Sequence, residues 1–427
     1  MSQKIPGFST LAVHAGAKPD PATGARITPI YQTTGYVFDD ADHAASLFGL
    51  KAFGNIYTRI MNPTQAVLEE RIAALEGGTA ALATASGHSA QHLIFHTIMR
   101  PGENFVAARK LYGGSINQFG HAFKNYGWEV RWGDVNDVST FESQIDDKTR
   151  AIFIESLANP GGEFVDIEAI GNIARKHGLP LIVDNTLATP YLVRPLEHGA
   201  DIIVHSLTKF IGGHGNSMGG MIVDGGTFDW SKSGNYPMLS EPRPEYGGVV
   251  LHETFGNFAF AIACRVLGLR DIGPAISPFN AFQILTGCET LPLRMQRHCD
   301  NAITVAGWLS NHPKVAWVSY PGLAGDKNHA LQKRYSPRGA GAVFTFGLKG
   351  GYDAGVKLVE GLELFSHLAN LGDTRSLVIH PASTTHRQLS DEQKIAAGAG
   401  PDTVRLSIGI EDSNDIVADL EQALSKV

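Results

Sequence analysis

The sequence predicts an α/β fold, in which a mostly parallel seven-stranded sheet is flanked by helices and a smaller α+β domain follows at the C-terminal end. Between about residues 79 and 225, short apolar runs alternate with helical patterns, which is typical of a parallel sheet covered on both faces. Glycine makes up 48 of the 427 residues. That share is well above the usual ~7 %, and no low-complexity tract accounts for it. The excess therefore indicates many tight turns between short elements.

Composition and charge narrow the class of protein. A hydrophobic content of 43 % and a charged content of 18 % are those of a globular chain, and the net charge of −7 argues against a nucleic-acid partner. No apolar run approaches the ~18 residues of a membrane span, and the N-terminus has no signal-peptide pattern. The three cysteines, Cys264, Cys288 and Cys299, show no CxxC spacing, which favours a reducing compartment. We therefore expect a cytoplasmic protein with no membrane-embedded part.

The N-terminal segment lacks strong periodicity but is rich in aromatic and apolar side chains. A long irregular segment at a terminus is either disordered or packed on another chain, and the aromatic content favours the second. We expect residues 1–63 to form an arm that contacts a neighbouring subunit. Residues 64–285 are expected to form a large domain, and residues 286–427 a C-terminal α+β domain.

Helix and strand signals then follow in order. The turn at 62–64 starts a helix with Leu68, Ile72 and Leu75 on one face, and Gly77-Gly78 ends it. Asp166 is the expected N-cap of a second helix over 166–177. Seven apolar runs predict the strands Ala80–Ala85, Asn104–Ala108, Glu129–Trp132, Ala151–Glu155, Leu181–Asp184, Asp201–Ser206 and Gly220–Val223.

The last third of the chain has a pattern of its own. Residues 225–290 open with a Gly/Ser/Pro-rich loop and turn helical over His252–Leu267. A helix around Gly287 is expected to continue into residues 302–309 and to bridge the two domains. The elements expected beyond it are strands at Val315–Tyr320, Ala342–Leu348 and Val404–Ile408, and helices at Asp353–Gly361, Asp391–Ala397 and Asn414–Leu424.

Polar residues follow four of the predicted strands where each strand ends. Residues 86–89 (Ser-Gly-His-Ser) open a helix, Asn159 follows the fourth strand, Asp184 ends the fifth and Lys209 follows the sixth. Because ligands bind beyond the carboxyl ends of parallel strands, we expect these groups to share one pocket. Alone, Lys209 could be a surface lysine beside a flexible turn, and Asp184 a turn aspartate. That alternative does not explain why polar groups gather where the apolar runs stop.

One cofactor uses all four groups. Pyridoxal phosphate needs an anion cradle such as a helix N-terminus, a lysine that captures its aldehyde, and an anion beside its pyridine nitrogen. A lysine beside apolar surface can have a lowered pKa, because burial disfavours its charged form, and the neutral amine is a nucleophile. The sequence therefore predicts a pyridoxal-phosphate site around Lys209.

Several blocks also match one known family, in order, from residue 57 to the C-terminus. They are Tyr57–Thr64, Ser86-Gly87, Tyr112–Ser115, Asp184–Thr186, Ser206–Phe210, Ser376–His386 and Val404–Gly409. In these blocks the chain resembles the Cys/Met-metabolism family of pyridoxal-phosphate enzymes. The resemblance implies the aspartate-aminotransferase-like fold (fold type I), pyridoxal 5'-phosphate as cofactor, and a homotetramer built from two catalytic dimers.

The resemblance also implies roles for individual residues. Lys209 is the implied Schiff-base lysine and proton shuttle, Asp184 the partner of the pyridine nitrogen, and Arg405 the group that binds the substrate's α-carboxylate. The other implied cofactor contacts are Ser86, the backbone N–H groups of Gly87 and His88, Thr186, the hydroxyls of Ser206 and Thr208, Tyr112 stacked on the ring, Asn159 at the phenolic oxygen, and Tyr57 and Arg59 at the phosphate of the neighbouring subunit. Tyr112 and Tyr57 are further catalytic candidates, and Ser376, Leu377 and Asn159 are candidate substrate contacts.

A few positions depart from the family pattern. His88 and the two residues before Asn159 differ from the common spelling, but contacts made through the backbone should tolerate His88. Four histidines could suggest a metal, but they lack the spacing of metal ligands, so no metal is expected. They are His205, His214, His380 and His386.

Two features favour one activity within the family. Residues 225–282 form an extended region, and Gly114 stands where methionine γ-lyases tend to carry a cysteine. The resemblance therefore favours a γ-replacement transferase of methionine biosynthesis, which converts O-acetyl-L-homoserine and sulfide, or a thiol such as methanethiol, to L-homocysteine, or L-methionine, and acetate. Methionine γ-lyase, O-succinylhomoserine sulfhydrylase and cystathionine γ-synthase activities remain as alternatives.

Overall fold

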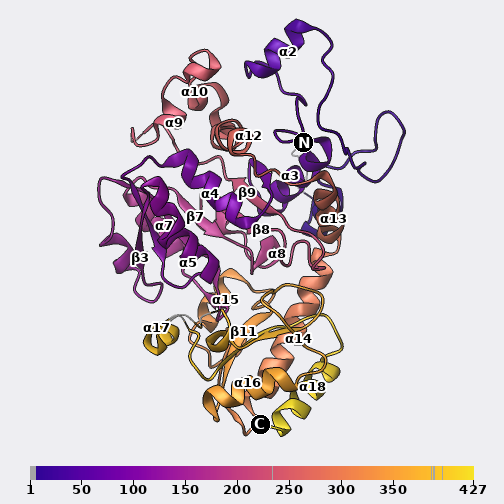
Figure 1. Ribbon diagram of the computed structural model, residues 1–427, viewed down its shortest axis with the longest axis vertical. Helices are drawn as coiled ribbons and strands as arrows, with labels where there is room; N and C mark the ends of the chain where they lie inside the picture. The colour runs from indigo at the N-terminus through magenta and orange to yellow at the C-terminus, as the bar shows by residue number, and fades with distance from the viewer. Residues whose placement is uncertain (1–5, 233, 386, 388–389, 397) are drawn as a thin grey trace.

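The computed structural model describes residues 6–427, with residues 233, 386, 388–389 and 397 left out. Figure 1 shows a larger upper part, which contains a seven-stranded sheet, and a smaller lower part, which contains a five-stranded sheet and the C-terminus. Among the described residues, no helix combines the length and the apolar character that a membrane span requires.

The larger sheet is mostly parallel. Its strands are β1 (Ala80–Thr84), β2 (Asn104–Ala108), β3 (Glu129–Gly133), β4 (Thr149–Glu155), β7 (Leu181–Asp184), β8 (Ile202–Ser206) and β9 (Gly220–Asp224), in the spatial order β1-β9-β8-β7-β4-β2-β3. Strands β3, β2, β4, β7 and β8 pair in parallel, whereas β9 is antiparallel to β8 and β1. Strands β2, β4 and β9 are buried along their whole length, as expected for a sheet covered on both faces. The predicted fold class is confirmed, and each predicted strand lies within two residues of its expected bounds.

The helices around this sheet begin and end at the local signals in the sequence. They include α3 (Pro63–Glu76), α4 (Gly87–Ile98), α5 (Gly113–Gly120), α6 (Ser139–Glu142), α7 (Ile167–Lys176) and α8 (Thr189–Leu192). The Asn62 side chain caps α3 by accepting the N–H of Thr64 at 2.9 Å, and Gly77 ends that helix with a φ of 79°. Asp166 caps α7 by accepting the N–H of Ala169 at 3.1 Å, as predicted.

The N-terminal segment contains two helices that the sequence did not predict. Helix α1 (Phe8–His14) packs on α3, where buried Arg71 donates to the carbonyl oxygens of Ala12 and Ala15. Helix α2 (Ala41–Phe48) projects from the upper end of the molecule in Figure 1. Side chains around α2 are open to solvent, with Val37 95 % and Phe53 73 % exposed.

In the extended region beyond β9, the helical stretch expected over 252–267 is interrupted at Gly256. Helices α9 (Pro237–Ser240) and α10 (Leu251–Phe255) precede this glycine, whereas α11 (Ala259–Ala263), a π-helical stretch at Cys264–Leu269 and α12 (Arg270–Ile272) follow one another without a break. Gly256, which follows α10, has a φ of 54° and ψ of −121°, a conformation that no helix continues through.

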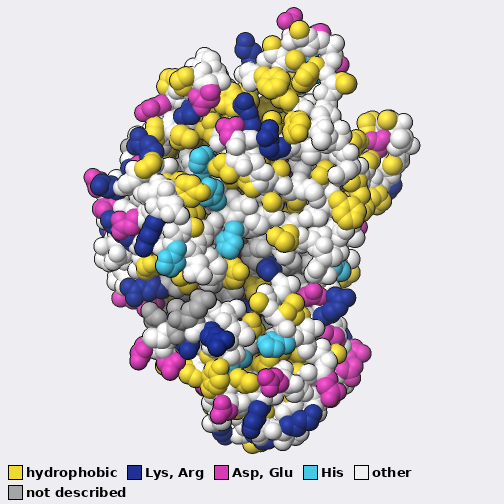
Figure 2. Space-filling model, in the orientation of Figure 1, with side chains coloured by type: hydrophobic (Ala, Val, Ile, Leu, Met, Phe, Trp, Pro, Cys, Tyr) yellow, Lys and Arg dark blue, Asp and Glu magenta, His cyan; other side chains and the backbone are white. Residues whose placement is uncertain are grey.

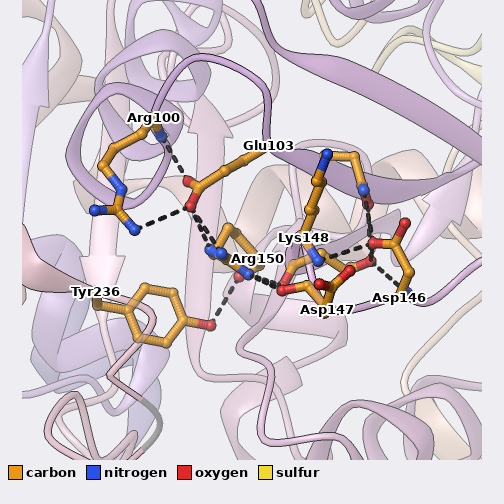
Figure 3. A network of polar contacts seen from close by, with 9 residues as sticks. Arg100, Glu103, Asp146, Asp147, Lys148, Arg150 and Tyr236 are labelled. Atoms are coloured by element: carbon orange, nitrogen blue, oxygen red, sulfur yellow. Dashed lines mark hydrogen bonds and ion pairs between the residues drawn. The ribbon is translucent and has the colours of Figure 1, made fainter.

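The buried side chain of Tyr236 anchors this region to the sheet (Figure 3). Its hydroxyl donates to the carbonyl oxygen of Arg150 at 2.9 Å, and the Arg150 guanidinium pairs with Glu103 at 2.7 Å. Both charged side chains are buried, so the cost of removing them from water is offset only if the geometry of the pair is good. Arg150 lies at the start of β4, so this contact is at the amino ends of the strands, whereas the predicted site is at their carboxyl ends.

The lower part of the molecule begins after two consecutive helices, α13 (Pro278–Glu289) and α14 (Leu291–Ser310). Its sheet has the order β10 (Val315–Ser319), β11 (Val343–Leu348), β14 (Thr403–Ser407), β13 (Leu377–Ile379) and β12 (Ser366–His367), with α15 (His329–Tyr335), α16 (Gly351–Gly361), α17 (Asp391–Ala396) and α18 (Ser413–Ser425). The three predicted strands occur as β10, β11 and β14, whereas β12 and β13 were not predicted. The expected last residue of α17, Ala397, lies outside the described residues.

Candidate active site

A cavity of about 300 Å³ lies beyond the carboxyl ends of β4, β7 and β8, where the two parts of the molecule meet. Most of the predicted site residues line it, namely Ser86, Gly87, His88, Tyr112, Asn159, Asp184, Thr186, Ser206, Thr208, Lys209 and Arg405. Ala369, Asn370 and Leu371 contribute from the lower part. The rule that ligands bind at strand carboxyl ends therefore located the cavity correctly.

One wall is the turn that opens helix α4. Ser86 caps the helix, its hydroxyl oxygen accepting the N–H of Ser89 at 3.2 Å. A Cβ placed on Gly87 would lie 3.0 Å from the Cβ of Ser206, so glycine allows this turn to approach the end of β8. The N–H groups of a first helical turn and the helix dipole favour an anion, and the hydroxyls of Ser206 and Thr208 line the same cavity. The arrangement is suited to a phosphate group.

Lys209 reaches the cavity from the turn after β8. Its Nζ donates to Oδ1 of Asn370 at 2.6 Å. Burial, together with the positive charge of Arg405, lowers the Lys209 pKa to about 8. An amine with this pKa is partly neutral near pH 7, which is the form that attacks an aldehyde.

Two carboxylates lie side by side in the cavity wall, because Asp184 of β7 pairs in register with Glu155 of β4. Burial raises the pKa of both acids, and the charge of Asp184 raises that of Glu155 further. Within the described part of the chain, neither carboxylate lies in an ion pair. Asp184 accepts the N–H of Thr186 at 3.0 Å and faces the amide of Gln91 at 3.4 Å. A cationic group bound here would relieve the cost of both buried charges.

Glu155 is a site residue that the sequence analysis missed. Its two carboxylate oxygens accept the backbone N–H of Tyr112 at 2.7 Å and of Asn159 at 2.9 Å. The carboxylate therefore ties together two loops that carry predicted cofactor contacts. Its position as the last residue of a buried strand was the available signal, since a charged side chain there is uncommon.

Tyr112 stands at the cavity wall and is 49 % exposed. Its ring lies 5.8 Å from that of His88, inclined by 32°. A Cβ on Gly114 would overlap the Tyr112 ring and would lie 2.8 Å from Cε1 of His88. Glycine at 114 is therefore what lets the tyrosine and histidine rings occupy this space.

Arg405 enters the cavity from β14 and is 9 % exposed. Its Nη1 donates to Oδ1 of Asn159 at 3.1 Å, and its Nη2 donates to the carbonyl oxygen of Asn370 at 3.2 Å. Burial lowers the Arg405 pKa to about 10. No carboxylate of the described residues pairs with this guanidinium, so a bound carboxylate would find a buried cation with donors to spare.

Four predicted site residues do not line this cavity. Tyr57 is 44 % exposed and lies against Arg59, whose guanidinium carbon is 5.3 Å from the Tyr57 ring centre. Ser376 and Leu377, expected as substrate contacts, are buried away from the cavity wall. The Ser376 hydroxyl donates to Glu411 at 3.0 Å and accepts the N–H of Gly409 at 2.9 Å, so it is used inside the fold. Residues 369–371, slightly earlier in the chain, line the cavity instead, as does Thr385 of the same predicted block.

The histidines weighed as metal ligands are placed apart. His205 of β8 lies 2.6 Å from Glu76, His214 lies against the carbonyl oxygen of Gly212 and His380 against that of Pro401. His386 lies outside the described residues. Among the described residues, no cluster of three or more His, Cys, Asp or Glu is arranged to hold a metal ion.

The cavity fits pyridoxal phosphate group by group. The first turn of α4 is suited to bind its phosphate, and Lys209 is suited to react with its aldehyde. Asp184 and Glu155, which have no cationic partner among the described residues, are suited to a protonated ring nitrogen. Asn159 lies in the same wall. Arg405 remains for the carboxylate of an amino-acid substrate.

Comparison with known proteins agrees with this assignment. The family model described as Cys/Met metabolism PLP-dependent enzyme, where PLP is pyridoxal phosphate, matches residues 9–425. The chain is 54 % identical to the O-acetyl-L-homoserine sulfhydrylase of Leptospira meyeri, over 98 % of this chain and 96 % of that relative. It is 51 % identical to the homocysteine synthase of Schizosaccharomyces pombe, over 98 % of each chain.

One solved structure has nearly the same fold as this chain. It is described as an O-acetylhomoserine (thiol)-lyase from Campylobacter jejuni and carries a pyridoxyl-lysine monophosphate. It superposes with a TM-score of 0.96 at 40 % identity, covering 98 % of this chain and 100 % of its own.

Proposed function

This chain belongs to the Cys/Met metabolism family of pyridoxal-phosphate-dependent enzymes, and we propose that it catalyses γ-replacement on O-acetyl-L-homoserine. The C–O bond between the γ-carbon and acetate breaks, a C–S bond to sulfide forms, and the products are L-homocysteine and acetate. A thiol such as methanethiol in place of sulfide gives L-methionine. The observation that carries the proposal is sequence similarity: more than half of the aligned residues, over nearly the whole chain, are identical to those of relatives named O-acetyl-L-homoserine sulfhydrylase and homocysteine synthase.

When bound, pyridoxal phosphate supplies an aldehyde for amines and a protonated ring that withdraws electrons from the substrate's α-carbon. We assign Lys209 to the aldehyde and Asp184 to the ring nitrogen. Ser86, the N–H groups of Gly87 and His88, and the hydroxyls of Ser206 and Thr208 would hold the phosphate. Tyr112, Thr186 and Asn159 would contact the ring. Their places in the cavity wall support these assignments.

Arg405 holds the α-carboxylate of the amino acid through its paired N–H groups. Lys209 Nζ then removes the proton from the α-carbon and later returns one, because its pKa of about 8 lets the same atom act as base and acid near neutral pH. A positioned acid–base group of this kind typically contributes about 10²–10⁴-fold. Asn370, bonded to Lys209 and to Arg405, keeps the two groups in one place.

The site is completed by a second copy of the chain in this proposal. Tyr57 and Arg59 lie outside their own cavity, and the N-terminal segment that contains them exposes large apolar side chains, including Ile27, Val37 and Phe53. Figure 2 shows hydrophobic side chains on the upper part of this face, in the region of α2. A homotetramer of two catalytic dimers would bury this surface and bring Tyr57 and Arg59 to the neighbour's phosphate. We place the enzyme in the cytoplasm, with residues 1–63 as the arm, 64–285 as the cofactor domain and 286–427 as the C-terminal domain.

One assay of the purified holoenzyme tests the function. O-acetyl- or O-succinyl-L-homoserine is supplied with sulfide, methanethiol or cysteine, and L-methionine is supplied alone. We expect homocysteine from the acetyl ester and sulfide as the fastest reaction. Faster turnover of the succinyl ester, cystathionine from cysteine, or methanethiol release from methionine would instead assign one of the three alternative activities. Lys209→Ala should lose both turnover and the visible band near ~420 nm expected of the lysine-bound cofactor.

A further inference from the structure

Helix α14 (Leu291–Ser310) contacts the two segments that carry the charged groups of the site. In Figure 1 it runs from the upper part of the molecule into the lower part. Its first turns contact the turn that follows Lys209, and the same helix contacts the end of β14, which carries Arg405. None of its residues lines the cavity.

Arg294, near the start of α14, is a buried cation that bonds only neutral groups among the described residues. It is 5 % exposed. Its Nη1 donates to the carbonyl oxygen of Phe210 at 2.6 Å, and its Nη2 to those of Ile211 at 3.0 Å and Gly287 at 2.7 Å. Burial lowers its pKa to about 10. A charge held this way costs free energy unless its hydrogen bonds are well made.

The fit around this guanidinium is tight. Gly213 has a φ of 74°, and a Cβ there would overlap Nη1 of Arg294. The chain after Lys209 therefore wraps closely around the guanidinium. The planar fork of arginine reaches three carbonyl oxygens at once, which the single ammonium of lysine cannot do with the same geometry.

His298 lies one helical turn later and contacts both segments. Its ring packs edge-on against Phe210, with ring centres 5.2 Å apart and an angle of 85°. Burial lowers the His298 pKa to about 4, so the ring is neutral near pH 7. Its Nδ1 lies 2.7 Å from the carbonyl oxygen of Ile408, and because a carbonyl can only accept, Nδ1 carries the proton.

Asn301 extends the same contact beyond β14. Its Nδ2 donates to the carbonyl oxygens of Gly409 at 3.0 Å and Glu411 at 2.7 Å. One face of α14 therefore bonds the turn after Lys209 through Arg294, and the end of β14 through His298 and Asn301.

We propose that Arg294 is a positioning residue, which with His298 holds the Lys209 turn at a fixed place relative to the strand that carries Arg405. The inference rests on the proposed function in that Lys209 moves the α-proton while Arg405 holds the carboxylate. Those two groups must be held at a set separation for the proton transfer to occur, and misplacement by about 1 Å can cost about 10²-fold in rate. Arg294 acts through backbone carbonyl oxygens and touches no reacting atom.

The test uses the holoenzyme with Arg294→Lys and Arg294→Met, and with Arg297→Met as the matched control. Arg297 lies on the exposed side of the same helix, where it pairs with Asp412 at 2.9 Å. The measurements are kcat and KM for the amino-acid substrate, and the visible circular dichroism of the cofactor per bound molecule, which reports how firmly its surroundings are ordered. Thermal unfolding is recorded for each variant.

For Arg294→Lys we expect a folded holoenzyme whose kcat falls by about tenfold or more, with a smaller change in KM and a loss of visible dichroism. Arg297→Met should keep the wild-type values of all three. An Arg294→Lys enzyme with wild-type kcat and dichroism would overturn the proposal, as would an equal loss in Arg297→Met. If Arg294→Met does not fold, Arg294→Lys and His298→Asn decide the matter by the same criteria. A wild-type protein without γ-replacement activity or a visible band would instead overturn the proposed function.

Discussion

The pKa of Lys209 gives the sharpest quantitative test of the site. In the cofactor-free protein, burial first and the charge of Arg405 second lower this pKa from 10.5 to about 8. At pH 7 a pKa of 8 leaves about 9 % of the amine neutral, against about 0.03 % for a pKa of 10.5, which is a gain of about 300-fold in nucleophile. The shift therefore changes the neutral fraction of the amine at pH 7 by more than two orders of magnitude.

The same shift has a consequence for folding stability. A basic group whose pKa is lowered in the fold binds fewer protons there than in the unfolded chain between about pH 8 and 10.5. Stability therefore rises with pH across that window, and below about pH 8 the folded state bears the full cost of the buried ammonium, about 3 kcal/mol.

Competitive labelling of the cofactor-free protein with a neutral acylating reagent measures the pKa directly. Peptide mass spectrometry follows Lys209 against pH, and exposed Lys357 on α16 corrects for decay of the reagent. We expect a midpoint near pH 8. Arg405→Met should move the midpoint up, but not to the ordinary value, because burial is the larger cause. Arg297→Met, which removes an equal charge outside the cavity, should leave it in place. A wild-type midpoint near 10.5, or no rise in Arg405→Met, would refute this reasoning.

Three further changes test other contacts of the site. Asn370→Asp places a negative charge beside Lys209 Nζ, so the labelling midpoint should rise and turnover at pH 7 should fall about tenfold per unit of rise; an unchanged midpoint would contradict this. Gly114→Cys should displace Tyr112 and raise KM for the amino acid more than it lowers thermal stability, whereas a wild-type KM would show that the ring has room. Glu155→Gln leaves one of two N–H groups without an acceptor, a cost of about 1–3 kcal/mol, seen as a lower Tm and weaker cofactor retention; retention equal to wild type would count against its role.

The strands could be predicted because a strand buried on both faces of a sheet consists of consecutive apolar residues, which are visible in the sequence. Residues 151–154 and 181–183 are buried and form unbroken apolar runs, each followed by an acidic residue. Strand β13 (Leu377–Ile379) could not be found this way, since three residues carry no period and its pairing with β14 is set by tertiary contacts. Helix α1 was missed for the same reason, because Arg71 of α3 supplies its fixing contacts.

The same distinction separates the predicted from the missed site residues. Asp184 and Lys209 follow from the geometry of a parallel sheet, which brings strand ends together whatever the loops do. Asn370 comes from a loop of the lower part, 161 residues beyond Lys209, and nothing in its local sequence says that it meets the lysine. Ser376 was expected as a substrate contact because the resemblance identifies the block Ser376–His386, whereas the structure shows that Thr385 of this block lines the cavity. Tyr57 and Arg59 stay predictions, since one chain does not bring them to its own site.

The charges of the cavity themselves specify the polarity of what binds there. Burial raises the pKa of Asp184 and Glu155, so each acid ionises only at a cost. Burial also lowers the pKa of Lys209 and Arg405, so each cation is costly as well. A ligand that brings a positive ring nitrogen to the acids and a carboxylate to the cations offsets both costs, and a ligand turned the other way increases both. The acids lie on β4 and β7, and the cations on β14 and on the turn after β8, so these unlike charges favour one orientation of cofactor and substrate.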